Sequence, residues 1–212
     1  LQEWGNKRLG LTLCEDLWVE PKISGRSAPL CDPIAELQPL RPDLLINLSA
    51  SPFGQGKSER RRQLAGAAQE RLGCPVLYVN QVGGNDELIF DGNSFVLDAS
   101  GRLQLQLPCG ESALQVWDSE AIDDSTSIKL LNPEAELWRM LVLGVQDYAR
   151  KCGFKTALLG LSGGIDSALV AVLAVAALGS QHVRALLMPS PYSSDGSLQD
   201  SLTLAKRLEL ST

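Results

Sequence analysis

The chain has 212 residues, 44% of them hydrophobic and 21% charged, and its 19 basic and 25 acidic residues give a formal net charge of −6. This composition is sufficient for a sizeable α/β core and typical of a soluble, cytoplasmic enzyme. No apolar stretch reaches the length of a membrane span, and the acidic balance argues against electrostatic capture of a nucleic acid, so we expect neither partner.

The first motif along the chain is an apolar strand that ends at Cys14. A cysteine in this position can face a pocket and act as the nucleophile in acyl transfer from an amide. Taken alone, it is more often an inert buried residue. The run from Cys14 to Trp18, with the sequence Cys-Glu-Asp-Leu-Trp, closely resembles the nucleophile motif of the nitrilase-like glutaminase domain in glutamine-dependent NAD synthetases. The resemblance favours Cys14 as the catalytic residue.

Further segments in the first half of the chain are similar to the same family. They are residues 47–53 after a strand at 44–46, the strand and loop at 76–87, and a hairpin over 90–98 with its turn at 99–101. In the family, residues matched by Ser51 and Lys57 help to hold the head group of glutamine. Lys57 stands where arginine, a bidentate carboxylate ligand, is common. The resemblance also places Trp18 at the glutamine site.

Glu15 follows the nucleophile directly. Adjacent side chains of a strand point to opposite faces, so we do not expect Glu15 to be the catalytic base. We expect it to support the site through its backbone N–H or by substrate contact. The glutamate base and the lysine of the family lie upstream of the nucleophile and have no match here, and the chain begins at Leu1. These features predict a central fragment of a longer protein.

A basic helix is predicted over residues 58–72. It carries Arg60, Arg61 and Arg62, which we interpret as a solvated face because the chain has no second basic run. The five cysteines lack Cys-x-x-Cys spacing and are odd in number, so we expect neither disulfides nor a zinc site.

A polar, acidic segment at 111–132 separates two predicted domains. Residues 1–110 would form a partial nitrilase-like glutamine amidohydrolase domain. Residues 133–212 would form a partial NAD synthetase ATP pyrophosphatase domain. The second domain opens with a helix at 133–151, with Asn132 as its N-terminal cap, Pro133 at its first position and Gly153 as its stop.

The second domain continues with a strand at 156–161 and an Ala/Val/Leu-rich helix at 166–178, which we expect to be buried on the sheet. A second strand at 182–188 and a helix at 197–208 complete the pattern, and ligands of such sheets bind at the carboxyl ends of the strands. Between the first strand and helix, Ser162, Gly163 and Gly164 leave backbone N–H groups uncovered. Helix N-termini of this kind attract phosphate. The alternative is that the two glycines only form a tight turn.

The run from Ser162 to Ser167, with the sequence Ser-Gly-Gly-Ile-Asp-Ser, resembles the pyrophosphate loop of the N-type ATP pyrophosphatases. These enzymes cleave ATP to AMP and pyrophosphate while they adenylate a substrate. The resemblance implies ATP and Mg²⁺ as cofactors, with Asp166 as the magnesium ligand, a role that suits a hard oxygen donor. Asp166 could instead only stabilise the helix start. The implied ATP-binding residues are Gly160, Leu161, Ser162, Gly163, Gly164, Ile165, Asp166, Ser167 and Met188.

Two remaining features have simple interpretations. Met188 opens a Pro/Ser-rich segment, residues 188–194, that is similar to the family's lining of the ATP pocket but could be an ordinary loop. His182 is the single histidine and is expected to be structural, at the start of a strand, so no Ser-His-Asp triad can form.

The sequence therefore predicts an α/β protein: the C-terminal part of a nitrilase-like αββα domain, followed by the first βαβ unit of a Rossmann-like parallel sheet domain. The expected function is NAD synthesis with glutamine as nitrogen donor. Its small-molecule partners would be glutamine, ATP and deamido-NAD, and the full-length enzyme is expected to be a homo-oligomer. Two alternatives stay open: another amidating or thiolating N-type ATP pyrophosphatase, or a non-catalytic nucleotide-binding module.

Overall fold

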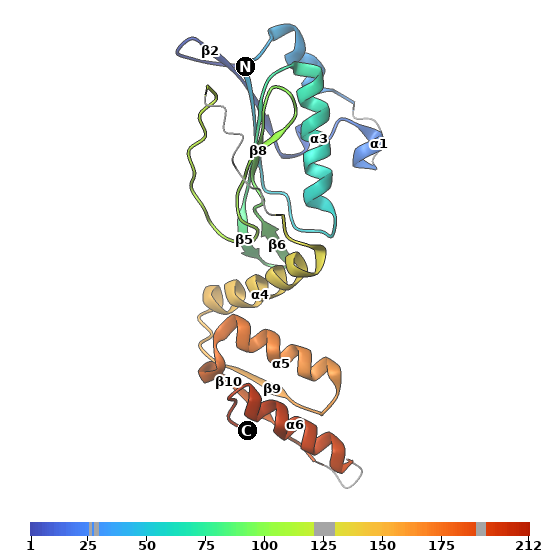
Figure 1. Ribbon diagram of the computed structural model, residues 1–212, viewed down its shortest axis with the longest axis vertical. Helices are drawn as coiled ribbons and strands as arrows, with labels where there is room; N and C mark the ends of the chain where they lie inside the picture. Colours follow the sequence, from blue (N-terminus) through green and yellow to red (C-terminus); the bar gives the residue numbers. More distant parts are fainter. Residues whose placement is uncertain (26, 28–29, 121–129, 190–193) are drawn as a thin grey trace. The chain divides into compact units, whose positions relative to one another are not determined.

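The computed structural model describes residues 1–25, 27, 30–120, 130–189 and 194–212 (Figure 1). The chain forms two compact units. The first comprises residues 1–83 and 88–137, and the second comprises residues 84–87 and 138–212. Residues 121–129, in the predicted linker, and 190–193, in the Pro/Ser segment, lie outside the described residues.

The first unit is built on a six-stranded sheet in the order β1-β2-β3-β4-β7-β8. Strands β2, β3 and β4 run parallel, whereas β1, β7 and β8 join antiparallel to their neighbours. The strands are β1 Gln2–Trp4, β2 Lys7–Leu13, β3 Leu44–Ser49, β4 Val76–Asn80, β7 Phe95–Leu97 and β8 Leu103–Gln106. β5 Val82–Asn85 and β6 Leu88–Asp91 form a separate pair.

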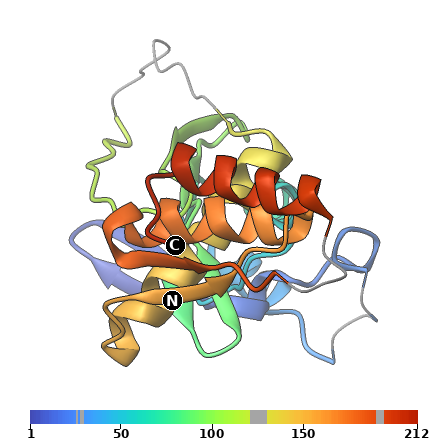
Figure 2. The ribbon, with the colours of Figure 1, turned by 90° about the horizontal axis from the view of Figure 1, so that it is seen from below.

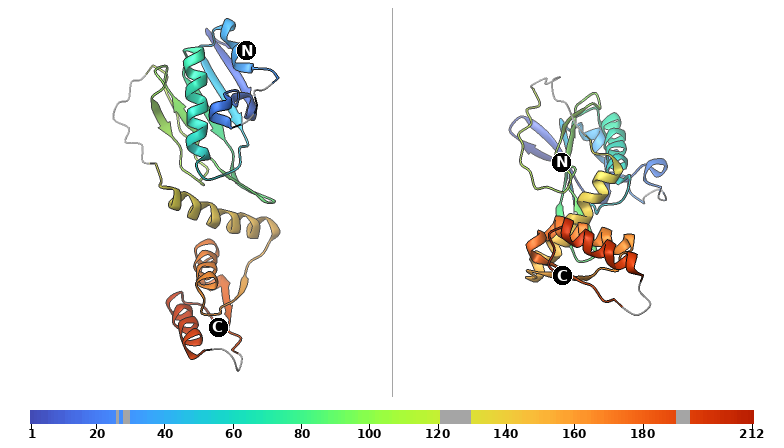
Figure 3. Two further views of the ribbon diagram at one scale, coloured as in Figure 1. Left: turned by 90° about the vertical axis from the view of Figure 1, so that its right-hand side faces the viewer. Right: turned by 60° about the horizontal axis from the view of Figure 1, so that its bottom comes forward.

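Helix α3, Lys57–Leu72, packs along this sheet, as the views in Figures 1 and 3 show. Its buried Leu64, Ala65 and Ala68 share one core with Leu45 of β3 and Val76 of β4. The helix ends at Gly73, whose φ of 68° suits glycine. The short helices α1 Pro21–Ser24 and α2 Pro33–Leu37 lie against α3, and the 3₁₀ turns η1 Cys14–Leu17 and η2 Gln38–Leu40 complete this layer.

Two expectations for this unit are wrong in detail. The strand predicted at 44–46 continues to Ser49, so Asn47 lies within β3 and not after it. Arg60 is exposed, but Arg61 does not lie on a solvated face, because only 1% of its side chain is exposed. The spacing of α3 explains this burial. Arg61 lies three, four and seven residues before Leu64, Ala65 and Ala68, so it shares their face.

The second unit has a parallel β-α-β core, as predicted. β9 Ala157–Gly160 pairs with β10 Val183–Leu186, and α5 Ile165–Leu178 connects them. α6 Asp195–Arg207 follows, and Figure 2 shows both helices beside the two strands. α4 Pro133–Cys152 precedes this core, and the Asn132 side chain caps it by accepting a hydrogen bond from the Ala135 N–H at 2.8 Å.

One face of the two-stranded sheet is covered. Val183 and Ala185 of β10 pack with Ala171 and Ala174 of α5 and with Ala205 of α6. The expectation that α5 is buried is therefore correct only for its alanine stripe. Leu169 and Val170, on another face of α5, are 55% and 53% exposed.

His182 does not begin a strand. It ends the 3₁₀ turn η3 Ser180–His182, and its Nδ1 lies 2.8 Å from the carbonyl oxygen of Leu178 at the end of α5. Among the described residues, none of the helices combines the length and the hydrophobicity that a membrane-spanning helix requires.

The five cysteines differ in burial, and this difference is testable. Cys31 and Cys152 are exposed, Cys14 is partly buried, and Cys74 and Cys109 are buried. Burial raises the pKa of the Cys74 thiol to about 11, which suppresses the reactive thiolate. Under native conditions, a thiol reagent at pH 8 should modify Cys31 and Cys152 first and leave Cys74 unmodified until the protein unfolds. Peptide mass spectrometry would check this, and rapid native labelling of Cys74 would contradict the packing.

Candidate active sites

Cys14 lies in a strained turn at the end of β2. Its φ is 46°, in the left-handed region that residues other than glycine seldom adopt. The turn is held by a hydrogen bond of 2.9 Å from the Leu13 N–H to the Asp16 carboxylate, and by one of 2.8 Å from the Trp18 N–H to the Glu15 carbonyl. Strain of this kind costs on the order of 1–3 kcal/mol and is concentrated at functional sites.

Glu15 belongs to this 3₁₀ turn and not to a strand. The expectation that it points away from Cys14 because strand side chains alternate is therefore wrong in its reasoning. Its side chain is exposed, while its carbonyl accepts the hydrogen bond that closes the turn.

The neighbouring strand β3 supports the turn from the side. The amide Nδ2 of buried Asn47 donates to Thr12 Oγ1 at 3.0 Å and lies 3.5 Å from the Cys14 carbonyl oxygen. Ser49 Oγ donates to Asn47 Oδ1 at 2.6 Å, which fixes the orientation of the amide. Asn47 therefore connects the end of β2 to β3 directly beside the predicted nucleophile.

Tyr78 of β4 is a buried side chain near the Cys14 turn. Its ring stacks on Phe95 with a centroid distance of 5.0 Å and an interplanar angle of 8°. Burial raises the pKa of its hydroxyl, and the nearby Ser49, Arg61 and Ser51 only partly offset this effect. Tyr78 therefore remains protonated at neutral pH.

The structure brings together two of the predicted glutamine-binding residues. The Lys57 ammonium group, at the first position of α3, lies 5.6 Å from the centroid of the Trp18 ring, a cation–π arrangement. Ser51 is only 4% exposed, and its hydroxyl accepts a hydrogen bond from Arg61 Nε at 3.2 Å. Its backbone and side chain are thus fixed by protein contacts.

Sequence reasoning missed Asn47, Asn80 and Asp91, and it placed Arg61 wrongly. One signal was available for Arg61, because it lies one helical turn after Lys57 and so on the same side of α3. Asn80 and Asp91 each end a strand, but no local pattern in the sequence pairs them with Ser51 or Arg61.

The predicted phosphate loop follows β9 and opens α5. The Ser162 N–H donates to Ser167 Oγ at 3.2 Å, and the two serine hydroxyls lie 3.1 Å apart. The Gly164 N–H donates to Ser162 Oγ at 3.4 Å, a long bond. The expectation that these N–H groups are uncovered is therefore wrong for Ser162 and Gly164, whose N–H groups bond to serine hydroxyls within the loop. The loop still lies at the start of a helix of 14 residues, where the helix dipole favours an anion.

The two glycines of the loop have different roles. Gly163 has a φ of 81°, and a Cβ atom there would lie 2.4 Å from the Ser197 carbonyl oxygen at the start of α6. Gly163 is therefore required for the close contact of the loop with α6. Gly164 has a φ of −85°, and a Cβ there would meet only Ser162 Oγ, at 3.5 Å. The fold of this unit does not explain why Gly164 lacks a side chain.

The other predicted ATP-site residues surround this turn. Ile165, Asp166 and Gly160 are exposed, whereas Leu161 is buried. Met188 is 74% exposed and lies beside Gly160, since its Cε would be 3.4 Å from a Cβ atom added to that glycine. The described residues contain no cluster of three or more His, Cys, Asp or Glu side chains that could hold a metal. A single exposed carboxylate, Asp166, fits Mg²⁺ only if phosphate oxygens and water supply the other ligands, as is usual for this ion.

Comparisons with known proteins identify a family match for the second unit, which carries the Ser162 loop. Residues 137–212 match the family model described as NAD synthase. The second unit is therefore similar to NAD synthases.

Relatives that match nearly the whole chain, including the first unit, give a narrower similarity. The chain is 45% identical over 98% of its length to a glutamine-dependent NAD(+) synthetase from Synechocystis, and 42% identical over 96% to one from Rhodobacter capsulatus. A solved glutamine-dependent NAD+ synthetase from Acinetobacter baumannii, in complex with ADP, matches 99% of the chain with a TM-score of 0.87 and 34% identity. Over its own length, the chain is therefore similar to glutamine-dependent NAD(+) synthetases. It spans 38% and 36% of the lengths of the two relatives and 39% of the solved chain.

Proposed function

We propose that the full-length protein makes NAD from deamido-NAD, ATP and glutamine. The observation that carries this proposal is the combination, in one chain, of the strained Cys14 turn with the loop from Ser162 to Ser167. The similarity to glutamine-dependent NAD(+) synthetases supports it, because it covers both features. Another N-type ATP pyrophosphatase, such as a GMP synthetase or a tRNA thiolase, is not favoured, since such enzymes do not explain the first unit.

The first half-reaction would take place at Cys14. Its sulfur attacks the amide carbon of glutamine, the carbon–nitrogen bond breaks, and ammonia leaves while a thioester forms. Water then hydrolyses the thioester to glutamate and regenerates the thiol. Backbone N–H groups would stabilise the oxyanion, while Trp18, Lys57, Ser51 and Glu15 would form the glutamine-binding side of the site.

The second half-reaction would take place at the carboxyl end of β9. ATP adenylates the nicotinate carboxylate of deamido-NAD with release of pyrophosphate, and ammonia then displaces AMP to give NAD. The backbone and hydroxyl groups from Ser162 to Ser167 would bind the pyrophosphate, and Met188 would contact ATP. Bound Mg²⁺, held by Asp166, would neutralise charge on the phosphates.

The test is an assay of the full-length protein with deamido-NAD, ATP and either glutamine or ammonia. NAD, AMP and pyrophosphate should form in equal amounts with both nitrogen sources. Nucleotide binding without turnover under these conditions would favour a non-catalytic module instead. We include in the proposal a cytoplasmic location and a homo-oligomeric state, for which fractionation and light scattering are the respective tests.

The role of Asp166 gives a separate prediction. Asp166→Asn keeps the size of the exposed side chain but removes its charge, so the fold should be unaffected and Mg²⁺ binding at the phosphates weakened. NAD formation should fall by about 10²-fold with glutamine and with ammonia, on the scale of losing one electrostatic contact to the transition state. Asp195→Asn, at an exposed position in α6, is the matched control. Unchanged activity in Asp166→Asn, measured across a Mg²⁺ titration, would reject the metal role.

A further inference from the structure

A buried ion pair lies beside the glutamine-binding residues and has no assigned role. Arg61 Nη1 and Asp91 Oδ2 are 2.8 Å apart, and each side chain is 1% exposed. Removal of two charges from water is costly, and such pairs are often no more stabilising than apolar residues of the same volume. Asp91 Oδ1 is also buried without a hydrogen-bond partner among the described residues. Stability alone is therefore a poor explanation for this pair.

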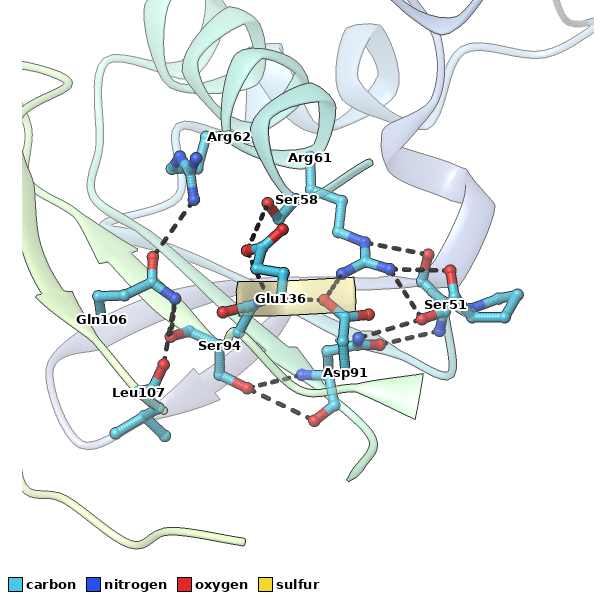
Figure 4. A network of polar contacts seen from close by, with 12 residues as sticks. Ser51, Ser58, Arg61, Arg62, Asp91, Ser94, Gln106, Leu107 and Glu136 are labelled. Carbon is cyan, nitrogen blue, oxygen red and sulfur yellow. Dashed lines mark hydrogen bonds and ion pairs between the residues drawn. The ribbon is translucent and has the colours of Figure 1, made fainter. Parts of the chain in front are cut away.

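The remaining donors of Arg61 point to the segment after β3, as Figure 4 shows. Nε donates to the Ser51 hydroxyl at 3.2 Å, and Nη2 donates to the carbonyl oxygens of Ser51 at 2.9 Å and Pro52 at 3.0 Å. Asp91 fixes the guanidinium group, since its carboxylate accepts from Arg61 and also from Asn93 Nδ2 at 2.8 Å. The planar guanidinium thus holds one short segment at three points.

Asn80 holds the same segment through two further hydrogen bonds. Its Oδ1 accepts from the Ser51 N–H at 2.8 Å, and its Nδ2 donates to the Ser51 carbonyl at 3.1 Å. The N–H, carbonyl and hydroxyl of Ser51 are therefore all bound by Arg61 or Asn80. Such contacts leave this residue a single conformation.

Arg61 also lies on the same helix as Lys57, four residues further along, and the Lys57 ammonium group lies over Trp18. The segment between Ser51 and Lys57 is thus attached to α3 at both of its ends. A shift of Arg61 would move Ser51 relative to Lys57, and displacement of binding groups by about 1 Å can cost about 10²-fold in rate.

We propose that Arg61, oriented by Asp91, is a positioning residue that sets the glutamine affinity of the Cys14 site by fixing Ser51 and Pro52. This inference rests on the proposed glutamine-dependent function. It requires no contact between Arg61 and glutamine. Loss of Arg61 should raise the KM for glutamine by about tenfold or more, with a smaller effect on kcat, because Ser51 is assigned to the substrate head group and not to the reacting amide.

The experiment uses the full-length protein and compares Arg61→Met with the double variant Arg61→Met/Asp91→Leu. The single variant leaves a buried, unpaired carboxylate and should be unstable, whereas the double variant replaces the pair by apolar side chains of similar volume and should retain the fold. For each variant we would measure KM and kcat for glutamine, the rate with ammonia, and the thermal midpoint. Arg62→Gln is the matched control, because Arg62 bonds to Glu59 and Gln106 and not to Ser51.

The expected result is a raised KM for glutamine in the double variant, with ammonia-supported NAD synthesis close to that of the wild type. The thermal midpoint should fall, because Ser51, Pro52 and Asn93 lose hydrogen-bond partners, but should stay above the assay temperature. Arg61→Lys, which keeps the charge but not the planar group, should have a KM for glutamine between those of the wild type and the double variant. A wild-type KM in the double variant would overturn the proposal, as would an equal loss of glutamine- and ammonia-supported activity. Absence of glutamine-dependent synthesis in the wild-type protein would instead contradict the proposed function itself.

Discussion

Replacement of Cys14 by alanine should abolish NAD formation from glutamine and leave NAD formation from ammonia unchanged. The substitution removes the sulfur that would form the thioester, so the glutamine-supported rate should fall by at least about 10⁴-fold, on the scale seen when a catalytic nucleophile is removed. The fold should tolerate it, because Cys14 is only partly buried and its left-handed conformation is equally uncommon for alanine.

The measurement is the steady-state rate of NAD formation by the full-length protein with each nitrogen source, together with release of glutamate. Cys152→Ala, which removes an exposed cysteine at the end of α4, is the matched control and should retain both rates. If Cys14→Ala lost both activities equally, or lost neither, Cys14 would not be the glutaminase nucleophile.

Local sequence patterns predicted much of the fold because they depend on short-range physics. Pro133 and Asn132 indicate the start of α4, Gly153 lies directly after its last residue, and the apolar run before the Ser162 loop indicates β9. The fold class and the β-α-β order are confirmed. The error at His182 arose because residues 180–182 form a 3₁₀ turn, which has no clear hydrophobic period.

The site was predicted less completely, for a different reason. Cys14, Trp18 and the phosphate loop belong to contiguous motifs, whereas the contacts of Arg61 join residues that lie 10 and 30 positions apart in the chain. A cluster of three arginines in a helix is usually solvated, and only the register of α3 shows that one of them faces the core. Long-range polar pairing of this kind has no signal in a single sequence.

Substitution of the two loop glycines should distinguish a phosphate site from a tight turn. Gly163→Ala would introduce a Cβ 2.4 Å from the Ser197 carbonyl oxygen at a φ of 81°, so the loop must move. This variant should lose thermal stability and lose ATP-dependent activity with both nitrogen sources. Its result alone does not separate the two interpretations, because a structural turn would be damaged in the same way.

Gly164→Ala distinguishes a phosphate site from a tight turn. Its φ of −85° and ψ of 157° suit any residue, and the new Cβ would make only an ordinary contact of 3.5 Å with Ser162 Oγ. If the glycines only form a turn, this variant should keep its activity and be slightly stabilised, since alanine restricts the unfolded chain. If the backbone N–H groups bind pyrophosphate, the Cβ should hinder close approach and weaken ATP binding by about tenfold or more, a loss of about 1.4 kcal/mol.

Calorimetric titration with a non-hydrolysable ATP analogue and a thermal melt, both on the full-length protein, would measure the two effects. Gly66→Ala in α3 is the control, because a Cβ there meets nothing within 4 Å and lies in the other unit. A folded Gly164→Ala protein with weakened nucleotide affinity assigns the loop to phosphate binding, since no contact within the unit requires that glycine. A folded Gly164→Ala variant with unchanged nucleotide affinity would show that Gly163 and Gly164 only form a turn. The ATP site would then have to lie elsewhere.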